Sequence, residues 1–417
     1  MQTRNKLVLA LCALGAALPA LSATRALLPP QDGDMVPATL LPRTTVAPAA
    51  QAVAQPRVHV ERQPVSVSWP LPRDAALQAR PQPFARSSRE YWTDVSATEL
   101  QRGVELPLSA PGAVIRLSPG DGTGGRLQPS AVRLRLGSRT LGADQAASQL
   151  ADAASLRAAG MAVPDATLVM KLRPELGSGT ATLQAPTASG RYVVHVFEPQ
   201  SAFSVTARAD RDDLLVGQRL HLRVGMQEGE RDRPLQAAGG FLRAPDGSTT
   251  LLDYRRQPDG SFAAEIAPAA VPATPGLWEV HSFTVGDDGQ GHAVRRDTTT
   301  VFTAATPDAR LDGAAEVRRA ADRGLDVRLG VAAASASRYA ASAVLYGRDA
   351  HGRMVPAAYA QSAAWLEPGN AALVLHYDAA SLRGVGAPYE LRDLRLQDQP
   401  AMGLVERRAL ALRFDAP

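Results

Sequence analysis

The sequence predicts a mainly β protein of three consecutive β-sandwich domains, and three observations lead to this expectation. One strand-like motif occurs three times. Its copies lie about one sandwich domain apart, and turn residues separate short segments of alternating apolar and polar residues between them. The chain of 417 residues is long enough for two to four domains, which leaves room for all three.

The repeated motif is built around a large aromatic residue, which is Tyr192, Trp278 or Tyr389. A small residue precedes the aromatic, an aliphatic residue follows it two places later, and a bulky apolar residue follows five places later. Strand side chains alternate between faces, so the aromatic and the aliphatic residue share one face. The aromatics are 86 and 111 residues apart, close to the roughly 100 residues of an immunoglobulin-like sandwich. We therefore assign each copy to a late strand of its own domain.

The first 23 residues have the pattern of a signal peptide. Arg4 and Lys6 precede an uncharged apolar run over residues 7–18, and small residues up to Ala23 offer a cleavage site. The run is shorter than the ~20 residues that a membrane-spanning helix needs. We therefore expect export to the periplasm or the medium, without stable membrane insertion.

The only cysteine, Cys12, lies inside this signal. Lipidation is the alternative, but Leu11 stands where a lipoprotein signal has a small residue. A mature chain without cysteine forms no disulfide, so each domain depends on burial of apolar side chains. Removing residues 1–23 lowers the formal charge from +4 to +2, and the remaining charges are dispersed. Nucleic acid is therefore not an expected partner.

Residues 24–85 are rich in Pro, Ala and Gln, and this composition predicts a flexible or extended spacer. One part differs, because residues 65–69 alternate between apolar and polar side chains. We expect this part to form an edge strand on the first domain, ended by Pro70 and Pro72.

The first domain is predicted over residues 86–199, with a helical insertion. Ser96 and Glu99 have the spacing of a capping box, which begins a short helix. Helix-forming composition predicts a second, longer helix over 145–159. Alternating segments predict strands at 105–108, 114–117, 132–136, 167–172 and 190–197.

The second and third domains are predicted over residues 200–304 and 305–417, with the same order of strands. In the second domain the predicted strands are 203–207, 220–224, 241–243, 250–254, 262–266, 278–283 and 295–302. In the third domain they are 325–329, 343–346, 372–377, 389–394 and 409–414. Repetition of this kind indicates tandem modules.

The repeated strand, the module around Trp278 and the entry to the first domain at Tyr91 and Trp92 resemble a known family. This is a family of exported bacterial proteins catalogued as domain of unknown function 4785. The resemblance covers about residues 86–417. It implies immunoglobulin-like modules after an N-terminal domain, and it brings no catalytic residues with it.

Histidines are the first candidates for chemistry, and two of them recur in the repeated motif. His195 and His281 both stand three places after the aromatic. They are either related ligand contacts or half-buried polar residues that an inherited strand retains, and the structural reading is favoured because repeats usually preserve structure. The sequence contains neither His-Glu-x-x-His nor Gly-x-Ser-x-Gly, so no metalloprotease or serine hydrolase motif is present and no enzyme is expected.

Two further features are weak candidates for binding. Asp210, Asp212 and Asp213 lie at the predicted junction of the first two domains, where carboxylates can hold calcium. Asp is also a common turn residue, and that interpretation is favoured, so no metal or cofactor is expected. Trp365 is the best candidate for an exposed aromatic contact, for instance with a sugar ring.

The function that these observations favour is non-enzymatic binding of another protein by an exported chain, in adhesion, envelope assembly or a host-facing role. The contact is expected through loops at one end of a sandwich or through an exposed edge strand. Two alternatives stay open. One is a carbohydrate-binding envelope protein, and the other is a hydrolase with dispersed catalytic residues in the first domain.

Overall fold

The computed structural model describes residues 23–43, 60–77, 83–120 and 122–415, and this part of the chain is mainly β. Six sheets, antiparallel except for one pair of strands, contain almost all of its regular structure. The helices are short: α1 (Ala97–Arg102), α2 (Ala143–Ala146) and α3 (Ala153–Ala158). No described helix has the length and apolar character needed to cross a membrane. The predicted signal peptide and Cys12 lie outside the described residues, apart from Ala23.

The six sheets form three pairs, and the two sheets of each pair share one hydrophobic cluster. In the first pair, one sheet has the order β4 (Glu90–Ser96), β12 (Arg191–Phe197), β6 (Val114–Gly120), β10 (Leu168–Leu172) and β9 (Ala147–Asp152). The other has the order β5 (Val104–Leu108), β11 (Gly179–Gln184), β7 (Arg133–Leu136) and β8 (Arg139–Gly142).

In the second pair, one sheet has the order β19 (Arg255–Arg256), β20 (Phe262–Ile266), β15 (Leu220–Glu228), β13 (Phe203–Ala209) and β3 (Ala85–Ser88), with β16 (Arg231–Arg233) beside β15. The facing sheet has the order β14 (Asp213–Leu215), β22 (Ala293–Ala305), β21 (Trp278–Asp287), β17 (Leu235–Arg243) and β18 (Thr249–Leu251).

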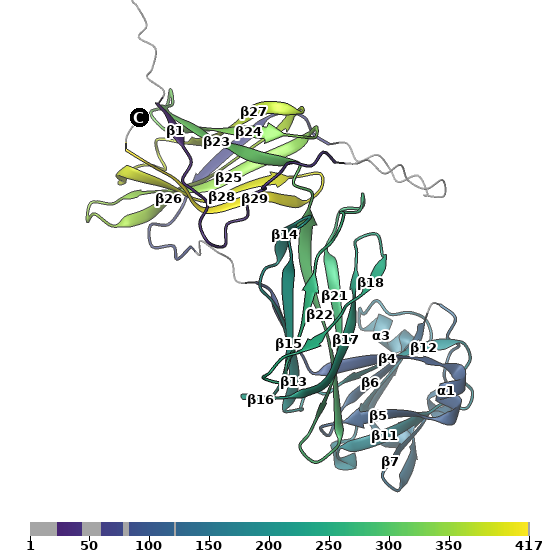
Figure 1. Cartoon of the computed structure of the whole chain (residues 1–417). Helices are drawn as coiled ribbons and strands as arrows, with labels where there is room; N and C mark the ends of the chain where they lie inside the picture. The colour runs from purple at the N-terminus through teal and green to yellow at the C-terminus, as the bar shows by residue number, and fades with distance from the viewer. Residues whose placement is uncertain (1–22, 44–59, 78–82, 121, 416–417) are drawn as a thin grey trace, which may run out of the picture.

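In the third pair, one sheet has the order β1 (Ala23–Ala26), β23 (Ala309–Arg319), β24 (Leu325–Ala333) and β27 (Gly369–Tyr377). The other has the order β2 (Val65–Pro70), β26 (Met354–Leu366), β25 (Ser337–Arg348), β28 (Gly386–Asp398) and β29 (Gly403–Phe414). Figure 1 shows the second pair of sheets between the other two.

Each aromatic of the repeated motif lies in a different pair of sheets. Tyr192, Trp278 and Tyr389 lie in β12, β21 and β28, each an interior strand of its sheet. Each is buried, and each belongs to a different hydrophobic cluster. Trp278 and Tyr389 also stack on the aromatic residue directly across the strand ladder, which is Phe302 or Phe414. Each copy therefore anchors a separate core.

The prediction of a spacer over 24–85 is wrong for most of the residues that the structure describes there. β1 pairs with β23, and β2 pairs with β26, so both strands complete sheets of the third pair. Leu27 and Met35 are buried in the same core. Residues 65–69 do form an edge strand, as expected, but on the last pair of sheets and not on the first. Figure 1 shows the purple N-terminal segment in the same body as the yellow C-terminal strands.

The physical reason lies in where the backbone partners come from. A Pro-rich segment has little apolar surface of its own, but a sheet edge elsewhere supplies hydrogen bonds and an open core. Arg73 adds to this, because its guanidinium donates to the carbonyl oxygens of Pro356 and Ala357 at 2.8 Å each. The segment is therefore ordered by contacts with residues almost 300 positions later.

The predicted helix over 145–159 is also wrong as a single element. Residues 147–152 form strand β9, which pairs with β10, and only short helices α2 and α3 flank it. Ala-rich composition is compatible with either state, and an open sheet edge beside β10 decides in favour of a strand. The capping box at Ser96 and Glu99 is confirmed, with Gly103 as the C-cap of α1.

Candidate functional site

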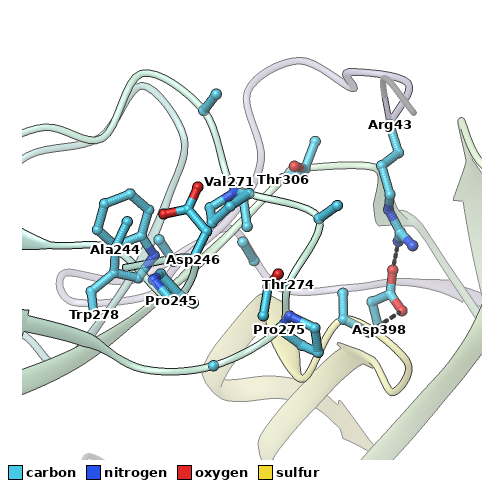
Figure 2. A pocket seen from close by; sticks show the side chains of 18 of the residues that line it. Arg43, Ala244, Pro245, Asp246, Val271, Thr274, Pro275, Trp278, Thr306 and Asp398 are labelled. Atoms are coloured by element: carbon cyan, nitrogen blue, oxygen red, sulfur yellow. Dashed lines mark hydrogen bonds and ion pairs between the residues drawn. The ribbon is translucent and has the colours of Figure 1, made fainter. Parts of the chain in front are cut away.

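A large cavity lies between the second and third pairs of sheets. It has a volume of about 870 Å³, within the range of ligand pockets. Its walls come from the β17–β18 turn, the loop over 267–277, the end of β22 and the start of β29, and Arg43 of the N-terminal segment completes it. Figure 2 shows Trp278 and Asp246 on one side of this pocket and Arg43 with Asp398 on the other.

One side of the pocket is apolar. The loop over 270–276 contributes Ala, Val and Pro side chains, and Pro245 and the indole of Trp278 lie beside it. Trp278 is only 7% exposed because its ring stacks on Phe302 below the loop. The prolines fix backbone dihedrals and leave few N–H donors, so this wall is stiff and poor in hydrogen-bond donors. It suits aliphatic or proline side chains of a ligand.

The opposite side carries a cluster of three charged residues. The guanidinium of Arg43 lies 2.5 Å from the carboxylate of Asp308 and forms a second ion pair with Asp398. Both carboxylates are almost fully buried, whereas the side chain of Arg43 is 33% exposed. Burial raises the pKa of Asp308, and the nearby Arg43 opposes this shift. Arg43 therefore compensates two buried negative charges that belong to the third pair of sheets.

Neighbouring hydroxyls hold this cluster in place. Ser335 Oγ accepts a hydrogen bond from the backbone N–H of Arg43 at 2.7 Å. Ser337 Oγ donates to Asp398 at 2.8 Å, and the hydroxyl of Tyr339 donates to the Ser335 carbonyl oxygen at 3.0 Å. The carboxylates thus face fixed donors and an arginine. Among the described residues, neither carboxylate contacts a histidine, as the acid of a catalytic triad does.

The described lining residues also carry polar groups. They include hydroxyls at Ser248, Thr274 and Thr306 but no His, Lys or Cys. Ser248 Oγ donates to the carboxylate of Asp246 at 2.6 Å, which holds both side chains within the β17–β18 turn. Apolar surface opposite a buried charge cluster favours reversible binding of an amphipathic segment.

The sequence-predicted contact residues lie elsewhere, and the structure brings two of them close to one aromatic side chain. His195 lies on β12, directly across the ladder from Trp92 on β4, and its Nε2 is 2.9 Å from Glu90. His281 lies on β21, with its ring 6.4 Å from that of Trp92 in an edge-to-face arrangement. Its Nε2 is 2.9 Å from Glu279, so both half-buried rings have carboxylate partners.

Trp365 is partly buried on β26 and already has partners within the chain. The guanidinium of Arg62 lies over its ring at 4.1 Å, and its Nε1–H donates to Glu367 at 2.8 Å. A cation over one aromatic face competes with stacking of a ligand on that face.

Two of the aspartates at 210–213, Asp210 and Asp213, have separate side-chain contacts. Asp210 accepts from the backbone N–H of His221 at 2.9 Å, and Asp213 forms an ion pair with Arg407 at 2.8 Å. Burial raises the pKa of Asp213. Among the described residues, no group of three or more His, Cys, Asp or Glu side chains is arranged to hold a metal ion.

Sequence reasoning missed Arg43, Asp308 and Asp398, which lie far apart in the chain. One signal was available for the apolar wall, because residues 268–275 contain three prolines between two predicted strands. A proline-rich loop of this length before a strand often has a role of its own. No comparable signal marks the charged residues.

Comparisons with known proteins are consistent with this architecture. The sequence model described as the N-terminal domain of a domain of unknown function (DUF4785) matches residues 56–198. The model described as its C-terminal domain matches residues 308–415. The chain matches no curated protein.

Among the solved structures that match, one has a clearly similar fold. The crystal structure of a DUF4785 family protein from Legionella pneumophila superposes with a TM-score of 0.69 at 21% identity, covering 85% of this chain and 94% of that one. A tetra-tandem repeat of a large adhesion protein has a TM-score of 0.17 at 14% identity, covering 72% and 74%. Salmonella alpha-2-macroglobulin has a TM-score of 0.19 at 11% identity, covering 79% and 23%.

Proposed function

Because this chain belongs to the DUF4785 family, a family of unknown function, we propose its role from the pocket itself: an exported, non-enzymatic binding protein made of immunoglobulin-like modules. The pocket between the second and third modules receives an apolar, proline-tolerant segment of a partner protein. The observation that carries this proposal is the lining, which places a stiff apolar wall opposite a buried charge cluster. Three modules, built mainly from residues 86–199, 200–304 and 305–417, are part of the same proposal, with β1 and β2 completing the third and β3 the second.

The geometry supports a protein segment as the ligand in two ways. A volume of about 870 Å³ holds several side chains of a loop, and exposed Ala273 and Thr274 leave its rim accessible. The mixed character of the walls matches protein interfaces, in which an apolar centre is bordered by polar groups. The partner's apolar side chains would pack on Pro245 and Trp278, with its polar groups toward Arg43.

The test is capture of the partner by the mature chain from envelope and culture-medium fractions. Ala273→Arg places a long charged side chain at the rim of the pocket. Ala269→Arg is the matched control, because Ala269 is also exposed in the same loop but does not line the pocket. We expect the native chain and Ala269→Arg to retain a partner that Ala273→Arg loses. Equal capture by both variants would contradict the proposal.

The export part of the proposal has its own measurement. The pattern of residues 1–23 favours removal of a signal peptide. Fractionation of cells, with N-terminal sequencing of the product, should find a chain that begins near Thr24 in the periplasm or the medium. A full-length chain that remains in the cytoplasm would contradict export.

A further inference from the structure

A second, smaller pocket lies on the outward face of the sheet that contains β17, β21 and β22. Its volume is about 300 Å³, and it is separate from the pocket described above. Three side chains with recognition chemistry line it, namely Phe283 of β21 and Arg295 and Asp297 of β22. In Figure 1 this face of the second pair lies toward β4 of the first pair.

The pocket exists because of a run of small residues on β17. Gly239 lies directly opposite Phe283 in the strand ladder, and a Cβ built at Gly239 meets no atom within 4 Å. Its neighbour Gly240 differs, because a Cβ there would collide with the carbonyl oxygen of His281. Close approach of backbones thus requires Gly240, whereas Gly239 leaves open space beside an aromatic ring.

Aromatic rings gather around this space. The ring of Trp92 meets that of Phe283 edge-on at 5.9 Å, and Phe241 lies 5.8 Å from Phe283. His281 stacks on Phe241 at 4.6 Å. The recurring histidine of the sequence motif therefore supports an aromatic surface that two pairs of sheets build together. These contacts hold the Phe283 ring in one orientation.

The polar groups at the pocket are of opposite charge and are held in place. Arg295 lies over the ring of Tyr91 at 4.8 Å, and Asp297 accepts from the backbone N–H of Trp92 at 2.9 Å. Among the described ion pairs, none joins Arg295 to Asp297. A donor group and an acceptor group beside an aromatic ring favour a neutral ligand that has both hydroxyls and an apolar C–H face.

We infer that this pocket binds one neutral pyranose unit of a glycan. The C–H face of the sugar packs on Phe283 over Gly239, and its hydroxyls accept from Arg295 and donate to Asp297. A single sugar ring fits the volume of about 300 Å³. An extended peptide would add along the edge of a strand, whereas Phe283, Arg295 and Asp297 line a hollow on the outward face of the sheet. This inference is independent of the proposed protein contact.

The experiment is saturation-transfer NMR of the mature chain with glucose, galactose, mannose and N-acetylglucosamine, each as the free sugar and as a β-linked disaccharide. Gly239→Leu fills the open space, and Ala237→Leu crowds the same pocket from an exposed position should the first variant fold poorly. Ala269→Leu, at an exposed loop position that lines neither pocket, is the matched control. The urea transition of each variant reports whether it is folded.

We expect at least one of these sugars to give a saturable signal with the native chain and with Ala269→Leu. The folded Leu variants should bind it at least about tenfold more weakly, because the sugar and the new side chain compete for one space. Absence of a signal from every sugar, or binding that persists unchanged in a folded Leu variant, would overturn the inference.

Discussion

The buried pair of Glu198 and Arg296 joins the first pair of sheets to the second. Both side chains are 0% exposed, and the Nη1 of Arg296 lies 2.7 Å from the Oε2 of Glu198. Glu198 also accepts from the backbone N–H groups of Ser109 at 2.6 Å and Ala110 at 3.0 Å. Arg296 in turn donates to the hydroxyls of Ser109 and Ser201 at 2.8 and 2.7 Å. The side chains in this network therefore hold one another in position.

The substitution Glu198→Gln keeps the size of the side chain and removes its charge. Breaking a buried pair from one side costs about 3–5 kcal/mol, because the remaining charge is uncompensated. The carboxamide also has a single oxygen, so one buried donor loses its acceptor at a cost of about 1–3 kcal/mol. These contributions overlap, and we expect the free energy of unfolding to fall by about 4 kcal/mol. That is a large share of the roughly 5–15 kcal/mol by which a domain is stable.

The assay is equilibrium urea unfolding of the mature chain, followed by tryptophan fluorescence. Hydrogen exchange in β12 and β22 assigns the transition, because a chain with several cores need not unfold in one step. The double variant Glu198→Gln with Arg296→Met should be at least about 2 kcal/mol more stable than the two single effects predict, since no charge remains buried. A cost below about 1 kcal/mol for Glu198→Gln, or simple additivity in the double variant, would refute this reasoning.

Three further predictions concern other contacts in the structure. Burial raises the pKa of Asp297 to about 6. The buried charge therefore does not destabilise the folded chain when the pH lies below the pKa of Asp297 in the unfolded chain, and it destabilises the folded chain fully once the pH is above 6. The stability of Asp297→Asn relative to the native chain should therefore increase by about 3 kcal/mol between pH 4 and pH 8, measured by urea unfolding, and a flat difference would contradict it. Arg43→Ala should destabilise the third pair of sheets by at least about 2 kcal/mol at pH 7, because Asp308 and Asp398 lose their counter-charge. That loss should shrink as the pH falls through the pKa of Asp308, and thermal unfolding at pH 5 and pH 7 checks it. Ser96→Ala removes the capping box of α1 and should cost about 1 kcal/mol, whereas Ser96→Asp should restore most of the loss in the same assay.

Local patterns in the sequence were sufficient for several elements. Alternation of apolar and polar side chains is a property of neighbouring residues, so most predicted strands of the second and third pairs are present in the structure. The aromatic residue of the repeated motif is buried in its core for the same reason. A capping box is also local, and α1 begins at the residue after Ser96 as the motif requires. These features need no knowledge of distant residues.

The structure differs from the sequence-based predictions where the residues that decide the local conformation lie far away in the chain. β9 looked helical because alanine tolerates both states, and only the edge of β10 selects a strand. The charged cluster at the pocket shows the same dependence. Arg43 meets Ser335 across 292 positions and Asp308 across 265, and no spacing within a single segment indicates either contact.

The sequence by itself determined which segments extend, which aromatics enter a core and that no described strand is held by a disulfide, since Cys12 is the only cysteine. Only the tertiary structure decided that residues 23–43 and 65–70 complete the last pair of sheets, and that the larger pocket forms where two pairs of sheets meet. The physical reason is that side-chain periodicity specifies a face, whereas an unpaired backbone edge accepts any strand that reaches it. The choice among possible edges is made by burial of Leu27 and Met35 and by compensation of buried charge by Arg43.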